Sequence, residues 1–262
     1  AISGKYDELV CTASFREDGT WIRIYPIQFR KKSFDQQYKK YDWIELDLVK
    51  NKSDFRPESY RPNSYDGDIK ILGHIDTDRN WAERKKIVLG KVYYNLKELV
   101  AEAQNKEITT SLAVFKPSKI IDFTIEESTR EWDKAKIQKL EAERLQFNLF
   151  QQPENLFEVV RKLPYKFSYT FEDNQGTIST LMIEDWEIGQ LYWNCLSRYE
   201  GDEAKAVVDV RKKYFDDFAK TKDLHLFLGT SQLHHYVSRN PFMIIGTFHP
   251  KIEMQGSLFV DT

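Results

Sequence analysis

The sequence predicts an α+β fold, in which a β-rich N-terminal subdomain is followed by a mixed α+β subdomain with mostly antiparallel strands. In the first third of the chain, short runs of alternating polar and apolar residues are separated by turn-forming residues. In the last third, segments of helical periodicity lie between further alternating runs. This order is typical of α+β proteins. We therefore expect subdomains at residues 1–125 and 126–250, and a C-terminal tail at 251–262.

The first third begins with a predicted β-hairpin. The runs "ELVCTASF" and "WIRIYPI" alternate in polarity, and the intervening "REDGT" contains the Asp-Gly turn signal. Because neighbouring side chains on a strand point to opposite faces, Trp21, Arg23 and Tyr25 share one face of the return strand. Ile22 and Ile24 then lie on the other face.

Further elements follow in order. "YDWIELDLV" and "DIKILGHI" predict strands, and helices are expected at about 80–90 and 96–105. "SLAVFKP" and "KIIDFTIEE" predict two more strands on either side of a Lys-Pro break. Residues 131–151 have apolar residues at helical spacing in a charged background, which predicts an amphipathic helix.

The last third begins with another predicted hairpin, in which "YKFSYTFED" alternates four aromatic residues and "NQG" turns into "TISTLMIED". Helices are expected at about 186–199 and 203–220. The strands "LHLFLGT" and "PFMIIGTFH" complete the subdomain.

Composition excludes several classes of protein. The 262 residues are 41% hydrophobic and 31% charged, as in a globular protein rather than a disordered one. The net charge of −2 provides no global basic field, so any nucleic-acid role must rest on a local patch. With only Cys11 and Cys195, neither a disulfide framework nor a cysteine-rich zinc site is expected, and a reducing cytoplasm fits. No apolar run approaches a membrane span, and no signal-peptide pattern precedes the first strand.

A stretch of interleaved cations and aromatic residues predicts a nucleic-acid-binding face in the N-terminal subdomain. Arginine suits phosphate oxygens, and aromatic faces suit bases. Alternatively, these cations pair with nearby acids, which are Asp35, Asp42, Glu45, Asp47, Asp54 and Glu58. The predicted contacts are Trp21, Arg23, Tyr25, Arg30, Lys31, Trp43, Arg56 and Arg61.

Three residues of the second subdomain are candidates for acid–base catalysis. "EDWEIG" places Asp185 and Glu187 where a strand leads into a helix, and His225 begins a later strand. Alternatively, Asp185 caps the helix, Glu187 interacts with the helix dipole, and His225 is a structural histidine. No phosphate loop, dinucleotide fingerprint, HExxH, GxSxG or paired CxxC motif occurs, so P-loop nucleotide hydrolysis and standard zinc hydrolysis are not expected. Glu184, Asp185 and Glu187 could instead hold a divalent metal, but no metal site is assigned and the cofactor is unknown.

The tail contains a candidate partner motif. "QGSLF" resembles the short peptide with which bacterial replication and repair proteins bind the sliding clamp, and Gln255, Ser257, Leu258 and Phe259 match its pattern. Gly256 departs from the usual apolar second residue of that pattern. "QFNLF" at 146–150 is a second near match, which we expect to belong to the core. If the tail instead packs on its own domain, this motif binds no partner.

Several stretches together resemble a family of uncharacterised prokaryotic proteins: "WIRIYPIQFR", "KKYDWIEL", "RPESYRP", "EDWEIG", "LFLGT" and "NPFMIIGTFHP". The resemblance spans most of the chain and brings no assigned activity, cofactor or catalytic residue.

These observations predict a DNA-associated protein of a prokaryotic or phage genome-maintenance or defence system, such as antiviral defence or DNA repair. Two alternatives remain open. One is an enzyme that acts on a nucleotide or a nucleic-acid base, a hydrolase for example. The other is a protein-interaction module without a nucleic-acid role.

Overall fold

The computed structural model describes residues 10–27, 29, 34–64, 67–132 and 161–253, and its contacts divide the chain into two units. The first unit comprises residues 1–78, 82–90 and 127–166. The second comprises 79–81, 91–126 and 167–262. The expected division fell at residue 125, whereas in the structure residues 91–126 cluster with the C-terminal strands. Each unit is described by itself below.

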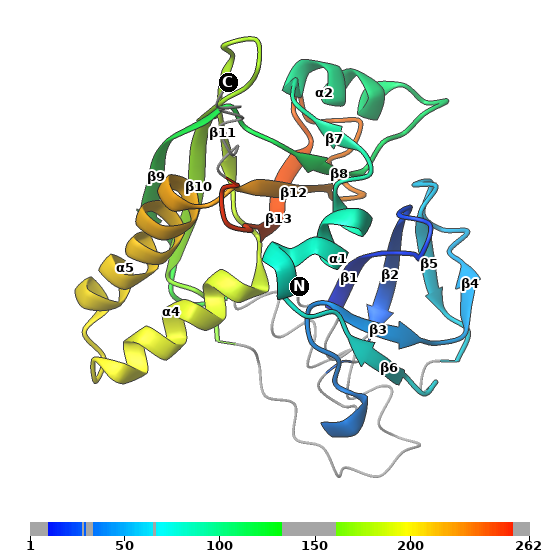
Figure 1. The fold of residues 1–262 in the computed structure, drawn as a ribbon, viewed down its shortest axis with the longest axis horizontal. Coiled ribbons are helices and arrows are strands. Elements are labelled where there is room, and N and C mark those ends of the chain that lie inside the picture. Colours follow the sequence, from blue (N-terminus) through cyan, green and yellow to red (C-terminus); the bar gives the residue numbers. More distant parts are fainter. Residues whose placement is uncertain (1–9, 28, 30–33, 65–66, 133–160, 254–262) are drawn as a thin grey trace, which may run out of the picture. The chain divides into compact units, whose positions relative to one another are not determined.

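The first unit is built from short strands (Figure 1). A four-stranded sheet has the order β1-β2-β5-β4, and β3 pairs with β6 in a two-stranded sheet. All these pairs are antiparallel except β2 with β5, which is parallel. The strands are β1 Val10–Phe15, β2 Trp21–Ile27, β3 Asp42–Glu45, β4 Leu48–Lys50, β5 Ser59–Pro62 and β6 Lys70–His74.

The predicted hairpin at the start of the chain is confirmed. β1 and β2 pair antiparallel, with Phe15 opposite Trp21. Gly19 takes up φ 77° in the turn, a conformation that glycine adopts without steric cost. Ile22 and Ile24 share a face, as the alternation predicts, and point into a buried cluster with Ile27 and Ile69. Side chains from both sheets, including Ile44 and Leu48, pack against this cluster, so the two sheets share one core.

Helix α1 (Asp78–Val88) follows β6 and has an irregular start. Its second to fourth residues, 79–81, adopt left-handed φ values of 48°, 55° and 65°. These three residues cluster with the second unit, whereas 82–90 remain with the first. The predicted helix at 80–90 is therefore regular only after this triplet.

The second unit contains two sheets, with the strand orders β11-β10-β9 and β13-β12-β8-β7. Most pairs are antiparallel, and β7 with β8 is parallel. The strands are β7 Val92–Tyr93, β8 Leu112–Phe115, β9 Lys119–Glu127, β10 Tyr165–Glu172, β11 Ile178–Met182, β12 His225–Thr230 and β13 Phe242–Phe248.

The predicted aromatic alternation on β10 places three side chains in the core of this unit. Phe167, Tyr169 and Phe171 are fully buried. Phe123 of β9 stacks on Phe167 with ring centroids 5.8 Å apart, and Tyr169 donates a hydrogen bond to the Tyr214 carbonyl (2.5 Å). This cluster of aromatic side chains therefore links the sheet to the helical segment that contains Tyr214.

The helices begin where the sequence places capping residues. Asn95 caps α2 (Leu96–Gln104), Asp185 caps α4 (Trp186–Arg198) and Asp202 caps α5 (Glu203–Arg211). In each case the side chain accepts hydrogen bonds from backbone N–H groups of the first turn, which lack partners within the helix. The predicted helix at 203–220 is α-helical only to Arg211 and continues as a π-helix, η4 (Lys212–Ala219).

The predicted fold class is confirmed: a β-rich N-terminal part precedes an α+β part with mostly antiparallel strands. No helix of the described residues is long and apolar enough to cross a membrane. The predicted helix at 131–151 falls mostly outside the described residues.

Candidate nucleic-acid-binding surface

A group of cations and aromatic rings gathers at the turn of the β1–β2 hairpin and on the neighbouring strands of the first unit. We call it the cation–aromatic surface; it consists of Phe15, Arg16, Trp21, Lys50 and Tyr60. The rings of Phe15 and Trp21 lie 3.8 Å apart between centroids. Arg16 donates to the Trp21 carbonyl (3.1 Å), and its guanidinium carbon lies 5.1 Å from the centre of the Tyr60 ring.

Lys50 completes this surface from β4. Its Nζ lies 4.9 Å from the centre of the same Tyr60 ring and donates to the Pro57 carbonyl. The pairing of Lys50 with Tyr60 across β4 and β5 brings the two residues together. A cation near an aromatic ring is stabilised by the ring quadrupole by about 0.5–1 kcal/mol at an exposed site. The surface thus holds two cations in fixed positions beside three aromatic rings.

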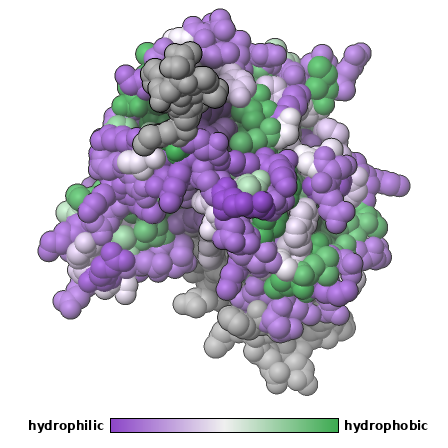
Figure 2. Space-filling model, viewed as in Figure 1, coloured by the Kyte–Doolittle hydropathy of each residue, from purple (hydrophilic) through white to green (hydrophobic). Residues whose placement is uncertain are grey.

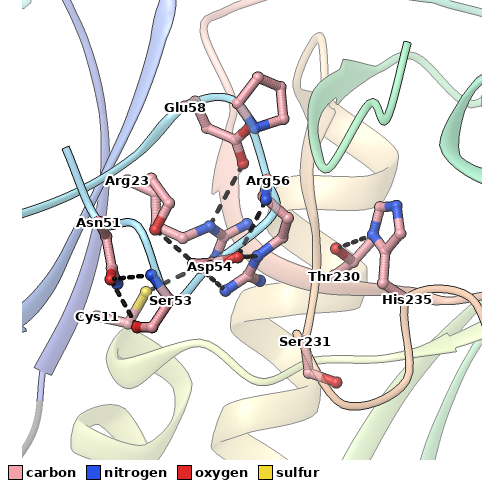
Figure 3. A network of polar contacts seen from close by, with 12 residues as sticks. Cys11, Arg23, Asn51, Ser53, Asp54, Arg56, Glu58, Thr230, Ser231 and His235 are labelled. Atoms are coloured by element: carbon pink, nitrogen blue, oxygen red, sulfur yellow. Dashed lines mark hydrogen bonds and ion pairs between the residues drawn. The ribbon is translucent and has the colours of Figure 1, made fainter. Parts of the chain in front are cut away.

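Two of the predicted phosphate-binding arginines lie elsewhere, in buried ion pairs (Figure 3). Arg56 donates from Nε to Asp54 Oδ1 (2.8 Å) and from Nη2 to Asp54 Oδ2 (2.6 Å). Arg23 Nε lies 3.4 Å from Glu58 Oε1. These ion pairs correspond to the alternative interpretation of the sequence, in which the cations pair with nearby acids instead of binding phosphate.

The Arg56–Asp54 pair fixes the loop that leads into β5. Asp54 also accepts hydrogen bonds from the Ser59 hydroxyl (2.7 Å) and from the Arg56 backbone N–H (3.1 Å). Burial by itself would raise the pKa of Asp54, but the hydrogen bonds from Arg56 and Ser59 outweigh it and hold that pKa below its usual value. Since Tyr60 follows Ser59 directly, this network positions the centre of the cation–aromatic surface.

The other predicted contacts are distributed as follows. Arg61 is exposed and pairs with Val49 of β4. Trp43 is partly exposed on β3, in the two-stranded sheet. Arg30 and Lys31 lie outside the described residues. The cations at positions 16 and 50 were absent from the prediction because their proximity to Tyr60 depends on strand pairing.

In the second unit, Asp185 and Glu187 occupy the start of α4. Asp185 Oδ1 accepts the Glu187 backbone N–H (3.0 Å), as an N-cap does, and Glu187 is exposed in the first turn. Burial raises the pKa of Tyr214 well above its usual value, and the charges of Asp185 and Glu187 raise it further. The two carboxylates therefore lie close enough to Tyr214 to favour its neutral form.

His225 lies on β12 and is separated from Asp185 by β13. Ile183 bridges to Ile244 at one edge of β13, whereas His225 pairs with Phe248 at the other edge. Two strand spacings correspond to about 10 Å between backbones. His225 is buried, and its Nδ1 lies 3.1 Å from the Asp223 carbonyl. The structure thus brings Asp185 and Glu187 together and places His225 on another strand.

Among the described residues, no group of three or more His, Cys, Asp or Glu side chains is arranged to hold a metal ion. The tail motif, with Gln255, Ser257, Leu258 and Phe259, lies outside the described residues, as does its near match at 146–150.

Comparison with known families gives two matches. Residues 93–262 match the model of the domain of unknown function DUF8757, which covers more than half of the chain. The chain belongs to the DUF8757 family. Residues 1–90 match the model of another domain of unknown function, DUF8758. This confirms the predicted resemblance to a family without an assigned activity. A search of curated proteins and a search of solved structures each gave no significant match.

The first matched segment ends at residue 90 and the second begins at residue 93, so the boundary lies between α1 and β7. The cation–aromatic surface lies in the part that matches DUF8758, and Asp185, Glu187 and His225 lie in the DUF8757 part. The candidate nucleic-acid contacts and the candidate acid–base residues therefore belong to different matched domains.

Sequence reasoning also missed a charged network in the first unit. His74 Nδ1 donates to Asp42 Oδ1 (2.6 Å), and Arg84 Nη2 donates to His74 Nε2 (3.1 Å). Arg84 also donates to the Ile75 carbonyl and lies over the Tyr41 ring, 3.7 Å from its centre. The network joins β3, β6 and α1. It depends on the antiparallel pairing of Asp42 with His74, which no local sequence pattern predicts.

Proposed function

We propose that the first unit binds nucleic acid, with DNA as the expected ligand, through the cation–aromatic surface and Arg61. The observation that carries the proposal is the placement of both Arg16 and Lys50 beside the Tyr60 ring, next to the Phe15–Trp21 pair. Proteins that bind single strands combine backbone-tracking cations with aromatic rings on which bases stack. Because the net charge of the chain is −2, such local cations must supply the attraction to phosphate.

The buried arginines have a supporting role in this proposal. Arg23 and Arg56 are engaged with Glu58 and Asp54, so they stabilise the sheet and the loop before Tyr60 rather than contact phosphate. The phosphate contacts then fall to Arg16, Lys50 and Arg61.

Fluorescence anisotropy with a labelled single-stranded oligonucleotide tests the proposal. Wild-type affinity should fall steeply between low and moderate salt, because phosphate binding releases condensed counterions. Replacing Lys50 or Arg61 by Ala should weaken binding and reduce the slope of log K against log salt by about 1 for each phosphate that is no longer neutralised. Lys97→Ala, which removes an exposed cation of α2 in the second unit, is the matched control and should leave both quantities unchanged.

A binding curve that is flat between low and moderate salt would reject nucleic-acid binding. Equal losses with Lys97→Ala and Lys50→Ala would show that only net charge matters, and would reject this surface as the site.

We further propose that the protein acts in the cytoplasm, in a prokaryotic or phage genome-maintenance or defence system. In this proposal its C-terminal tail binds a sliding clamp. Support for the recruitment comes from the match of residues 255–259 to the clamp-binding pattern. The double change Leu258→Ala and Phe259→Ala should abolish binding to a purified bacterial clamp. It should leave oligonucleotide binding unchanged, since neither residue belongs to the cation–aromatic surface. Clamp binding that survives this change would contradict the recruitment.

A further inference from the structure

The connection between β12 and β13 forms a single helical turn, which we call the apolar turn (residues 233–238). The Ser238 N–H donates to the His234 carbonyl (3.0 Å), the spacing of an α-helical hydrogen bond. The Ser231 hydroxyl accepts the His234 N–H (3.3 Å) at the start of the turn. On such a turn, residues 233 and 237 lie on one side and residue 235 on the other.

The inner side of the turn is anchored by His235, which is fully buried. Its Nε2 donates to the Ala103 carbonyl (2.9 Å), and its Nδ1 accepts from the Thr230 hydroxyl (2.7 Å). Figure 3 shows the His235 ring turned back toward Thr230. From α2, Gln104 Nε2 donates to the carbonyls of His235 (3.0 Å) and Ser238 (3.2 Å).

The outer side of the same turn is apolar. Leu233 and Val237 are 76% and 82% exposed, the highest values among the large hydrophobic side chains that the structure describes. Tyr236 between them is 36% exposed and shares a hydrogen bond with the Thr109 hydroxyl (2.8 Å). In the view of Figure 2 the molecular surface is mainly hydrophilic, with hydrophobic residues in separate patches. A fixed turn that exposes two aliphatic side chains has the features of an interface anchor.

We propose that the apolar turn is a self-association surface through which two copies of this chain meet about a two-fold axis. In such an arrangement the same patch faces itself, so it must be self-complementary. Leu233 and Val237 satisfy this requirement because one copy's aliphatic pair packs against the other's. Since His235 and Gln104 already fix the turn, little conformational entropy is lost on association.

The charges near the turn fit a self-complementary interface. Exposed Lys106 and Glu107 lie on the loop that contains Thr109, and exposed Arg239 follows the turn directly. With both signs present, a two-fold arrangement can set Glu107 of one copy against a cation of the other. A partner of uniform charge would be repelled by part of this rim. The aliphatic pair is small, so the dimer is weak and its population depends on concentration.

Sedimentation velocity of the full chain over a wide concentration range tests this proposal. The wild type should show a monomer–dimer equilibrium, and the double change Leu233→Ser and Val237→Ser should weaken it by about tenfold or more. Val208→Ser is the matched control, because Val208 is also highly exposed (62%) but lies on α5. Since all three side chains are exposed, the variants should keep the wild-type circular dichroism spectrum.

A second measurement tests the two-fold axis. In a Cys11→Ser background, which removes the exposed native thiol, Leu233→Cys should cross-link two chains through one disulfide on mild oxidation, and Val208→Cys should not. Three results overturn the proposal. In sedimentation, a wild type that stays monomeric at every concentration would assign the turn to a different protein partner, and a dimer that survives the double change would exclude the turn as the interface. In cross-linking, equal yields at positions 233 and 208 would exclude the two-fold contact.

Discussion

The side-chain amide of Asn80 pairs with both backbone polar groups of Lys251. Asn80 Nδ2 donates to the Lys251 carbonyl (2.9 Å), and the Lys251 N–H donates to Asn80 Oδ1 (2.8 Å). Asn80 is the middle residue of the left-handed triplet, and asparagine tolerates this conformation better than most residues. The next residue, Trp81, packs edge-on against Phe248 and His249. The triplet is thereby fixed to the end of β13.

Replacing Asn80 by Ala should destabilise this pairing. The change removes two hydrogen bonds and places an ordinary residue at φ 55°, so we expect the free energy of unfolding to fall by about 2–3 kcal/mol. Hydrogen exchange at the Lys251 amide should become faster. Asn80→Gly should recover part of the stability, since glycine tolerates the backbone conformation but forms no side-chain hydrogen bond. If the Lys251 amide exchanges as slowly in Asn80→Ala as in the wild type, the pairing does not hold this segment.

The buried Arg56–Asp54 pair should make the stability of the first unit depend on acid. The pKa of Asp54 is lower in the folded chain than the usual value of about 3.9. Its contribution is therefore fully present above about pH 4 and is lost as the pH falls through the folded-state pKa. At neutral pH, Asp54→Asn should cost about 3 kcal/mol, because it leaves Arg56 buried beside a neutral group.

Urea unfolding of wild type and Asp54→Asn at several pH values measures this effect. The difference between the two free energies of unfolding should shrink as the pH falls below about 4. Glu17→Gln, a change at an exposed carboxylate in the β1–β2 turn, should have no measurable effect at neutral pH. A difference that is constant with pH would show that Asp54 stabilises the fold by packing alone.

Asp185 should behave as a helix cap when it is replaced. Asp185→Ala removes the acceptor for the Glu187 N–H and should lower the free energy of unfolding by about 1 kcal/mol. Asp185→Asn keeps the acceptor oxygen and should stay within about 0.5 kcal/mol of the wild type. If Asp185→Ala were as stable as the wild type, the capping role would be rejected, and a chemical role for this carboxylate would gain weight.

His235 should be the most sensitive residue of the β12–β13 connection. His235→Ala removes a fully buried ring and leaves the Ala103 carbonyl and the Thr230 hydroxyl without that partner, so we expect the free energy of unfolding to fall by about 3 kcal/mol. The neighbouring His234 is exposed, and His234→Ala should cost less than about 0.5 kcal/mol. Thermal unfolding of the two variants compares them directly, and equal melting temperatures would contradict the anchoring role.

The sequence located the strands better than it located the candidate site. Alternation put Ile22 and Ile24 on one face because the period of a strand is a local property, and the structure shows that this face lies in the core. The same alternation put Arg23 with Trp21 and Tyr25 but did not show that Glu58, 35 residues away, would bury and neutralise it. Arg16 and Lys50 were overlooked for the related reason that Tyr60 reaches them only through the pairing of β5 with β4 and the position of the hairpin.

By itself, the sequence determined the fold class, the β1–β2 hairpin, the aromatic face of β10 and the capped start of α4. These features follow from periodicity and from side chains that bond to the backbone a few residues away. Only the tertiary structure decided which cations are buried and which are exposed, and which of two adjacent histidines anchors a turn. Those outcomes depend on partners distant in sequence, such as Ala103 for His235 and Lys251 for Asn80. Burial and hydrogen bonding at such sites are set by the packing of the whole unit, which local patterns do not specify.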